Sequence, residues 1–309
     1  MKKRLQNKIA ESRMALPISV VYGIMVWLMA GLIQEQWWIQ FCCFAISVYL
    51  MAELNNQNLL IRIFSRMVSC VYIVLICTAT FLFPSVLSAV MQLCTVASLF
   101  LLFHTYQDKQ AAGYTYYAFL CIGLASCVDI RVLYYMPAFW LLMAWFVYSL
   151  SWRTFLASLL GLITPYWFIL PWAVYHGELN VWVAHFAKLF DISTITLLNV
   201  SQIHFLGLLV VLGLMGGIHF YITSYLDKIR VRQLYYSFIL LTVYSTLVVF
   251  LQPKCYDMVT GIMIISVSPL LAHFIALTHT RLSNIVFLVI SVVILTLTVA
   301  NLWITSSLF

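Results

Sequence analysis

Charged residues are scarce in this chain. Of its 309 residues, 16 are Lys or Arg and nine are Asp or Glu, so that 8% are charged while 64% are hydrophobic. Soluble domains carry roughly 25% charged residues, which means that this chain has too little charge to cover a water-exposed surface. The shortage excludes an ordinary soluble globular protein and indicates a chain that is solvated by lipid.

The sequence also lacks the alternation of polar and apolar residues that a membrane β-barrel requires. Its apolar runs suit helices, because about 20 apolar residues cross a bilayer as a helix whose backbone groups are satisfied internally. We therefore predict an all-α, polytopic transmembrane bundle of about 11 helices. They are expected near residues 17–34, 38–52, 67–83, 87–104, 112–128, 132–149, 155–175, 203–224, 235–251, 258–278 and 284–306.

Motifs for metal binding and for disulfide formation are missing as well. Eight cysteines occur, but none is arranged as CxxC, and no two histidines have HxxxH spacing. Seven of the cysteines lie within apolar runs, where a thiol packs as a small hydrophobe, and Cys255 alone falls in a loop. We expect no disulfide, no metal site and no cofactor.

The placement of Lys and Arg predicts an orientation, because these residues accumulate on the cytoplasmic side of a membrane. With the N-terminus inside, 13 of the 16 basic residues fall in cytoplasmic segments, and only Arg131, Lys188 and Lys254 fall outside. Residues 1–16 form a basic cytoplasmic tail before an uncleaved first helix, and the C-terminus lies outside. We predict one transmembrane domain, 1–309, in the bacterial cytoplasmic (inner) membrane, with no nucleic-acid partner.

One acid and one base, Asp129 and Arg131, stand between two apolar runs in "CIGLASCVDIRVLYYMPAFW", at a tight outer turn. On a continuous helix, residues two apart point about 200° from each other and cannot pair. A helix break here relieves that conflict, so that both charges face an outer vestibule or bridge neighbouring helix ends. Structural bridging and a functional site are both open for this pair.

The outer loop, residues 176–202, is predicted to hold an amphipathic helix that lies in the membrane interface. Its apolar stripe is formed by Trp182, Val183, Phe186, Leu189 and Phe190, and the polar residues off the stripe are Asn180, His185, Lys188 and Asp191. Such a helix could roof a cleft that opens sideways to lipid, or merely cover the bundle. The candidate catalytic residues are Asp129 and Asp191, and the candidate substrate-binding residues are Arg131, Trp182, His185 and Lys188.

The predicted cytoplasmic side carries two basic segments. In "ELNNQNLLIRIFSRM", Arg62 and Arg66 are spaced i and i+4, which predicts a short amphipathic segment whose basic face meets anionic headgroups. The run "DKIRVR", residues 227–232, is most simply an anchor on the same side. Within the apolar runs, His219 and His273 are expected to make interhelical hydrogen bonds.

Two resemblances extend this interpretation. The phrases "ELNNQNLLIRIFSRM", "HTYQDKQAAGYTYYAFLCIGLAS" and "SLSWRTFLASLLGLITPYWF" resemble a family of polytopic inner-membrane proteins from Gram-negative anaerobes, which implies location and topology but no activity. Residues 113–178 are similar to the middle of membrane glycosyltransferases that use polyprenyl-phosphate sugar donors. Those enzymes carry an essential acid in a large first outer loop, whereas here that loop is "IQEQWW", with only Glu35.

Three hypotheses about function follow. The first is a protein that handles a lipid-linked glycan or another lipid substrate at the periplasmic face, with membrane lipids and a lipid-linked sugar as partners. The second is a transporter or flippase, in which Asp129, Arg131 and the prolines Pro165 and Pro171 line a path to the midplane. The third is a non-enzymatic scaffold or assembly factor. We favour the first, and the sequence leaves open whether the chain is an enzyme.

Overall fold

The computed structural model describes residues 4–191 and 199–307, and every regular element within them is a helix, which confirms the all-α class. The α-helices are α1 (Leu5–Ala10), α2 (Ala15–Met29), α3 (Trp38–Asn58), α4 (Met67–Thr78), α5 (Val86–His104), α6 (Ala112–Val128), α7 (Met136–Trp145), α8 (Trp152–Tyr175), α9 (Leu179–Ala187), α10 (Val200–Thr223), α11 (Ile229–Leu251), α12 (Tyr256–Leu277) and α13 (Arg281–Ser307). Short 3-10 helices are η1 (Thr80–Leu82), η2 (Ile130–Tyr135), η3 (Ser224–Leu226) and η4 (Pro253–Cys255).

Seven of these helices are long and apolar enough to cross a membrane, which makes the chain compatible with an integral membrane protein. They are α3, α5, α8, α10, α11, α12 and α13, some of them with an adjoining 3-10 turn. Four shorter apolar segments, Ala15–Met29, Met67–Thr78, Ala112–Val128 and Ile130–Trp145, occupy the other predicted positions. The number of crossings and the side that each terminus faces stay predictions.

Several boundaries differ from the predicted ones. The second helix α2 ends at Met29, because a turn with Gly31 at φ 107° and Gln36 at φ 55° follows it. In contrast, α3 continues past residue 52 to Asn58 and ends at Leu59, which adopts a left-handed conformation. Residues 60–66 are not helical, so the predicted pairing of Arg62 and Arg66 on one helical face is wrong.

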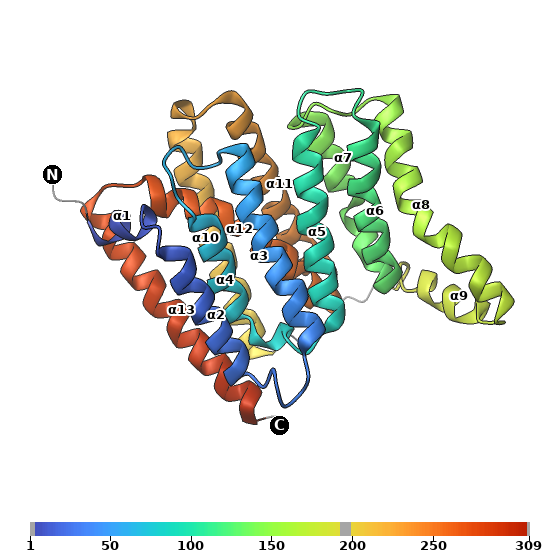
Figure 1. The fold of residues 1–309 in the computed structure, drawn as a ribbon, viewed down its shortest axis with the longest axis horizontal. Helices are drawn as coiled ribbons and strands as arrows, with labels where there is room; N and C mark the ends of the chain where they lie inside the picture. Colours follow the sequence, from blue (N-terminus) through green and yellow to red (C-terminus); the bar gives the residue numbers. More distant parts are fainter. Residues whose placement is uncertain (1–3, 192–198, 308–309) are drawn as a thin grey trace.

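The helices run between two ends of one bundle (Figure 1). At the first, called the α1 end, lie α1 and the connections that join α3 to α4, α5 to α6, α7 to α8, α10 to α11 and α12 to α13. At the second, called the α9 end, lie α9 and the interruption between α6 and α7, while α13 finishes there too. The segments of the α1 end contain the basic residues Arg4, Lys8, Arg13, Arg62, Arg66, Lys109, Arg153, Lys228, Arg230, Arg232 and Arg281, and those of the α9 end contain Arg131, Lys188 and Lys254.

At the centre of the bundle is α12, in which every residue except Asp257 and Leu277 is buried. It packs against α1, α4, α5, α10 and α11. Small residues at its crossings with these helices allow the backbones to come close. A Cβ on Gly216 of α10, for example, would lie 2.7 Å from the carbonyl carbon of Leu270 in α12.

The helices α6 and α8 cross with almost no space between their backbones. A Cβ on Gly123 would lie 2.9 Å from the carbonyl oxygen of Leu162, and one on Gly161 would overlap the carbonyl oxygen of Tyr116. Small residues at such crossings let helices approach closely, which van der Waals packing rewards in lipid. Beyond this crossing α8 leans away from the bundle toward α9 (Figure 1) and exposes the rings of Trp167, Phe168, Trp172 and Tyr175.

Substituting Gly161→Ala tests this crossing. The added methyl group must push α6 and α8 apart, at a cost of about 1 to 3 kcal/mol typical of overpacking. We expect a lower apparent melting temperature in detergent. The control is Gly113→Ala, because a Cβ at that position on α6 has no atom within 4 Å. Equal melting temperatures for the two variants would contradict the close crossing.

Candidate functional site

The predicted helix break at Asp129 is confirmed. Asp129 closes α6 with extended backbone angles (φ −140°, ψ 113°), and its carboxylate caps η2 by accepting a hydrogen bond from the Arg131 backbone N–H at 3.0 Å. The turn brings the two side chains together, so that Nε of Arg131 donates to both carboxylate oxygens at 2.9 and 3.0 Å, and Nη2 donates to Oδ2 at 2.7 Å. This fork-to-fork pair is the strong geometry for arginine and carboxylate.

A second ion pair adjoins the first. Nη1 of Arg131 lies 3.5 Å from the carbonyl oxygen of Lys254 in η4, and Nζ of Lys254 lies 3.1 Å from Oδ2 of Asp191. Asp129 is buried, with 5% of its side chain exposed, and 27% of Arg131 is exposed, whereas Lys254 and Asp191 are 38% and 61% exposed. These four residues, called the α9-end cluster, form a polar chain that runs from the protein interior to the surface.

Hydrogen bonds from two tyrosines hold the segment after α9 against this cluster. The hydroxyl of Tyr134 in η2 donates to the carbonyl oxygen of Leu189 at 2.6 Å. The hydroxyl of Tyr244 in α11 donates in turn to the carbonyl oxygen of Tyr134 at 2.5 Å. Asp191 follows Leu189 by two residues, so these contacts position its carboxylate beside Lys254. Residues 192–198 of the predicted outer loop lie outside the described part.

The helix α9 is attached to the bundle through Trp182, which the sequence places on the apolar stripe, and through His185, which it places off that stripe. Nε2 of His185 lies 2.9 Å from the carbonyl oxygen of Ser126, and because a carbonyl only accepts, Nε2 carries the proton. The ring of Trp182 lies edge-on to those of His185 and Tyr166. His185 is the one buried residue of α9, while Val183 of the predicted apolar stripe is exposed. A backbone acceptor thus compensates the burial of His185, which the sequence places off the apolar stripe.

The other predicted outer residues are not drawn into the cluster. Lys188 is exposed one turn beyond His185 and contacts no residue of the cluster through an ion pair within the described residues. Lateral cavities of about 400 and 490 Å³ are found among the described residues, the first lined by α1, α2, α4, α12 and α13 and the second by α10, α11 and α12. Neither is lined by a residue of the α9-end cluster. The cluster is thus a surface site at the end of the bundle.

The α1 end holds a buried ionic group that the sequence did not indicate. The carboxylate of Asp227, fully buried after η3, lies 2.9 Å from Nε of Arg62 and 3.2 Å from Nε2 of His273, which is fully buried in α12. Nearby, the rings of His219 and Tyr235 lie 5.4 and 4.9 Å from that of His273. Within the described part of the chain no three His, Cys, Asp or Glu residues are arranged to hold a metal ion.

The basic run 227–232 is more than a solvated anchor. Nη2 of Arg230 donates to Oδ1 of Asn58 at 2.9 Å and to the carbonyl oxygen of Phe103 at 3.1 Å, and the guanidinium lies 5.6 Å from the centre of the Tyr106 ring. The connection between α10 and α11 is thereby joined to the ends of α3 and α5. The one signal in the sequence was the single acid, Asp227, at the head of a run of cations.

Removing the cation from this buried pair should destabilise the fold. In Arg62→Gln the Asp227 carboxylate stays buried without its arginine, which costs roughly 2 to 4 kcal/mol, less than for a fully buried pair because 33% of the Arg62 side chain is exposed. The matched control is Arg66→Gln in the same connection, whose exposed side chain makes no ion pair within the described residues. Equal melting temperatures for both variants would show that the pair contributes nothing.

Comparison with known proteins does not extend the resemblances drawn from the sequence. No protein-family model, no curated protein and no solved structure matches the chain. The likeness to inner-membrane proteins of Gram-negative anaerobes, and that of residues 113–178 to polyprenyl-phosphate glycosyltransferases, therefore stay predictions.

Proposed function

We propose that the chain crosses the bacterial inner membrane 11 times, with the α1 end in the cytoplasm and the α9 end in the periplasm. The support is the separation of basic residues, since 11 of the 14 Lys and Arg residues in the described part of the chain lie in or beside α1, in the connections of the α1 end, or in the helical turns that adjoin those connections. Cytoplasmic segments carry this excess in membrane proteins. The orientation places the α9-end cluster at the level of the outer-leaflet headgroups.

The function that the geometry supports best is the handling of a lipid-linked substrate, such as a polyprenyl-phosphate-linked glycan, at the periplasmic face. The observation that carries it is the convergence of Asp129, Arg131, Asp191 and Lys254 from three separate segments. A surface cluster suits a ligand whose charged head stays at the interface while its chain remains in lipid. A phosphate group matches the two cations, because guanidinium and ammonium donors bind phosphate oxygens.

Each member of the cluster takes a distinct role in this proposal. Arg131, fixed by its bidentate contact with Asp129, and Lys254 bind the phosphate. Asp129 is a positioning residue, because its carboxylate is buried and fully engaged with Arg131. Asp191 is the exposed carboxylate; it leaves Lys254 when phosphate binds and then faces the part of the substrate next to the phosphate. If the protein is an enzyme, Asp191 is its candidate base.

The helix α9 and the half of α8 that leans away from the bundle, together called the α8–α9 arm, provide the route by which the substrate reaches the cluster from the membrane. Large aromatic side chains of α8, including Trp167, Phe168 and Trp172, are exposed on the half that leans away from the bundle. Aromatic rings are enriched at the membrane interface, where one face is apolar and the other meets headgroups. Trp182 and His185, which attach α9 beside the end of α6, would hold the arm at that depth while a polyprenyl chain lies along it.

Binding of a polyprenyl phosphate tests the assignment of cations. For purified protein in nanodiscs, Lys254→Gln should weaken binding about tenfold or more, because a hydrogen bond to a charged group contributes roughly 1.5 to 3 kcal/mol. Lys188→Gln is the matched control, an exposed cation directly after α9 that lies outside the cluster. Equal losses in the two variants would reduce the effect to general surface charge and contradict the site.

A test in cells addresses the substrate class. A strain lacking the protein should lose a surface glycan, and a copy carrying Asp191→Asn or Asp129→Asn should fail to restore it at unchanged expression. Lectin blots measure the glycan, and immunoblots measure the protein. Full restoration by both variants would favour a scaffold without carboxylate chemistry, and an intact glycan in the deletion strain would contradict the proposed substrate.

A further inference from the structure

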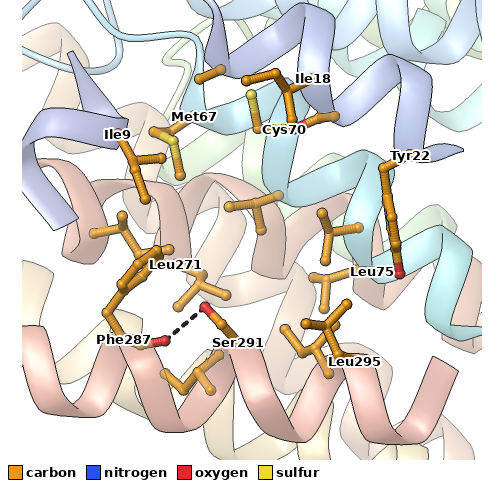
Figure 2. A pocket seen from close by; sticks show the side chains of 17 residues that line it. Ile9, Ile18, Tyr22, Met67, Cys70, Leu75, Leu271, Phe287, Ser291 and Leu295 are labelled. Carbon is orange, nitrogen blue, oxygen red and sulfur yellow. Dashed lines mark hydrogen bonds between the residues drawn. The ribbon is translucent and has the colours of Figure 1, made fainter. Parts of the chain in front are cut away.

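A lateral cavity of about 400 Å³ lies at the other end of the bundle from the proposed substrate site. Figure 2 shows side chains of α1, α2, α4, α12 and α13 gathered around it, among them Ile18, Leu75, Leu271 and Leu295. Its lining is almost entirely hydrocarbon: hydroxyl groups come only from Ser19, Tyr22 and Ser291. The Ser291 hydroxyl is already used, since it donates to the carbonyl oxygen of Phe287 at 2.8 Å.

Hydrogen bonds between helices border the cavity toward the α1 end and toward the α9 end, and its side is open. At the α1 end, the Gln6 side chain donates to the carbonyl oxygen of Ile275 and to Oγ1 of Thr278, each at 2.7 Å, which fixes α1 across the bundle. Toward the α9 end, the Tyr22 hydroxyl donates to Oγ1 of Thr298 at 3.2 Å and joins α2 to α13. Between these contacts, the exposed side chains of Ile18 and Leu295 border an opening onto the apolar outer surface.

Basic residues lie beside the end of the cavity that is nearest to α1. Residues 4–13 carry Arg4, Lys8 and Arg13 against a single acid, Glu11, and the side chains of Lys8 and Arg13 are exposed. Ile9, next to Lys8, and Ala15, two residues after Arg13, both line the cavity. The hydrocarbon lining and an exposed cationic rim therefore adjoin each other, as the tail and the headgroup of an acidic lipid do.

We propose that this cavity binds one acyl chain of an anionic phospholipid whose phosphate is held by Lys8 and Arg13. An apolar cavity of this size offers water no hydrogen-bond partner, whereas an acyl chain from the surrounding lipid fills it with dispersion contacts. Juxtamembrane cations attract acidic headgroups. The lipid would join α1, α2 and α13 and serve as a specific structural ligand, independent of the substrate proposed for the α9 end.

Native mass spectrometry of the full chain in mild detergent tests the inference. The probes are phosphatidylglycerol and phosphatidylcholine with identical acyl chains. Ser291→Phe fills the cavity and should abolish retained phosphatidylglycerol, whereas Thr296→Phe, an exposed residue on α13 that is not part of the lining, should not. The double variant Lys8→Gln and Arg13→Gln should lower the preference for phosphatidylglycerol roughly thirtyfold, equivalent to about 1 kcal/mol for each cation.

Other results of these experiments would contradict the proposed lipid site. Equal retention of the two lipids by the unmodified protein, or equal loss in both Phe variants, would overturn the specific site and leave only general contact with lipid. A dimer without lipid that Ser291→Phe converts to a monomer would assign the cavity to a second copy of the chain. If Ser291→Phe does not fold, as judged by its melting transition, the double charge variant decides alone, because its side chains are exposed.

Discussion

The central helix α12 imposes the constraint on which the rest of the fold depends. Nearly every side chain of α12 is buried, so α4, α5, α10 and α11 must surround it at close range. Close approach in turn requires small residues at the crossings, such as Gly216 against Leu270. Some of its polar side chains have partners within the bundle: Oγ of Ser266 accepts a hydrogen bond from Oγ1 of Thr242 at 2.9 Å, and Nε2 of His273 lies 3.2 Å from the carboxylate of Asp227. Such internal partners offset the cost of burying a polar group.

Because α12 and its neighbours pack against one another along their length, the charged side chains lie at the two ends of the bundle. At each end a charge pair lies where helices are interrupted. Asp129 and Arg131 meet at the junction of α6 and η2, and Asp227 meets Arg62 between two connections. The pairs differ in exposure, and this difference separates their roles. The Asp227 carboxylate is buried and holds helices together, whereas the α9-end cluster reaches the surface through Lys254 and Asp191.

Much of the fold could be predicted from local patterns. Apolar runs indicated the positions of the helices, and the spacing of Asp129 and Arg131 indicated the break, because a continuous helix would keep them apart. Contacts between residues far apart in the sequence could not be predicted from such local patterns. Lys254 and Asp191 are 63 residues apart and belong to no shared periodicity. His185 was placed by polarity alone, although the free carbonyl oxygen of Ser126 near the end of α6 compensates its burial. The i, i+4 spacing of Arg62 and Arg66 predicts contact with lipid headgroups, because nothing in the local sequence indicates the distant partner Asp227.

The central claim is that the α9-end cluster receives the phosphate of a lipid. A cryo-electron microscopy map of the protein in nanodiscs containing a polyprenyl phosphate tests it most directly. The account predicts headgroup density bridging Nζ of Lys254 and the guanidinium of Arg131, with the carboxylate of Asp191 moved away from Lys254. A map in which Lys254 and Asp191 remain paired, while the phosphate lies elsewhere on the protein, would contradict it.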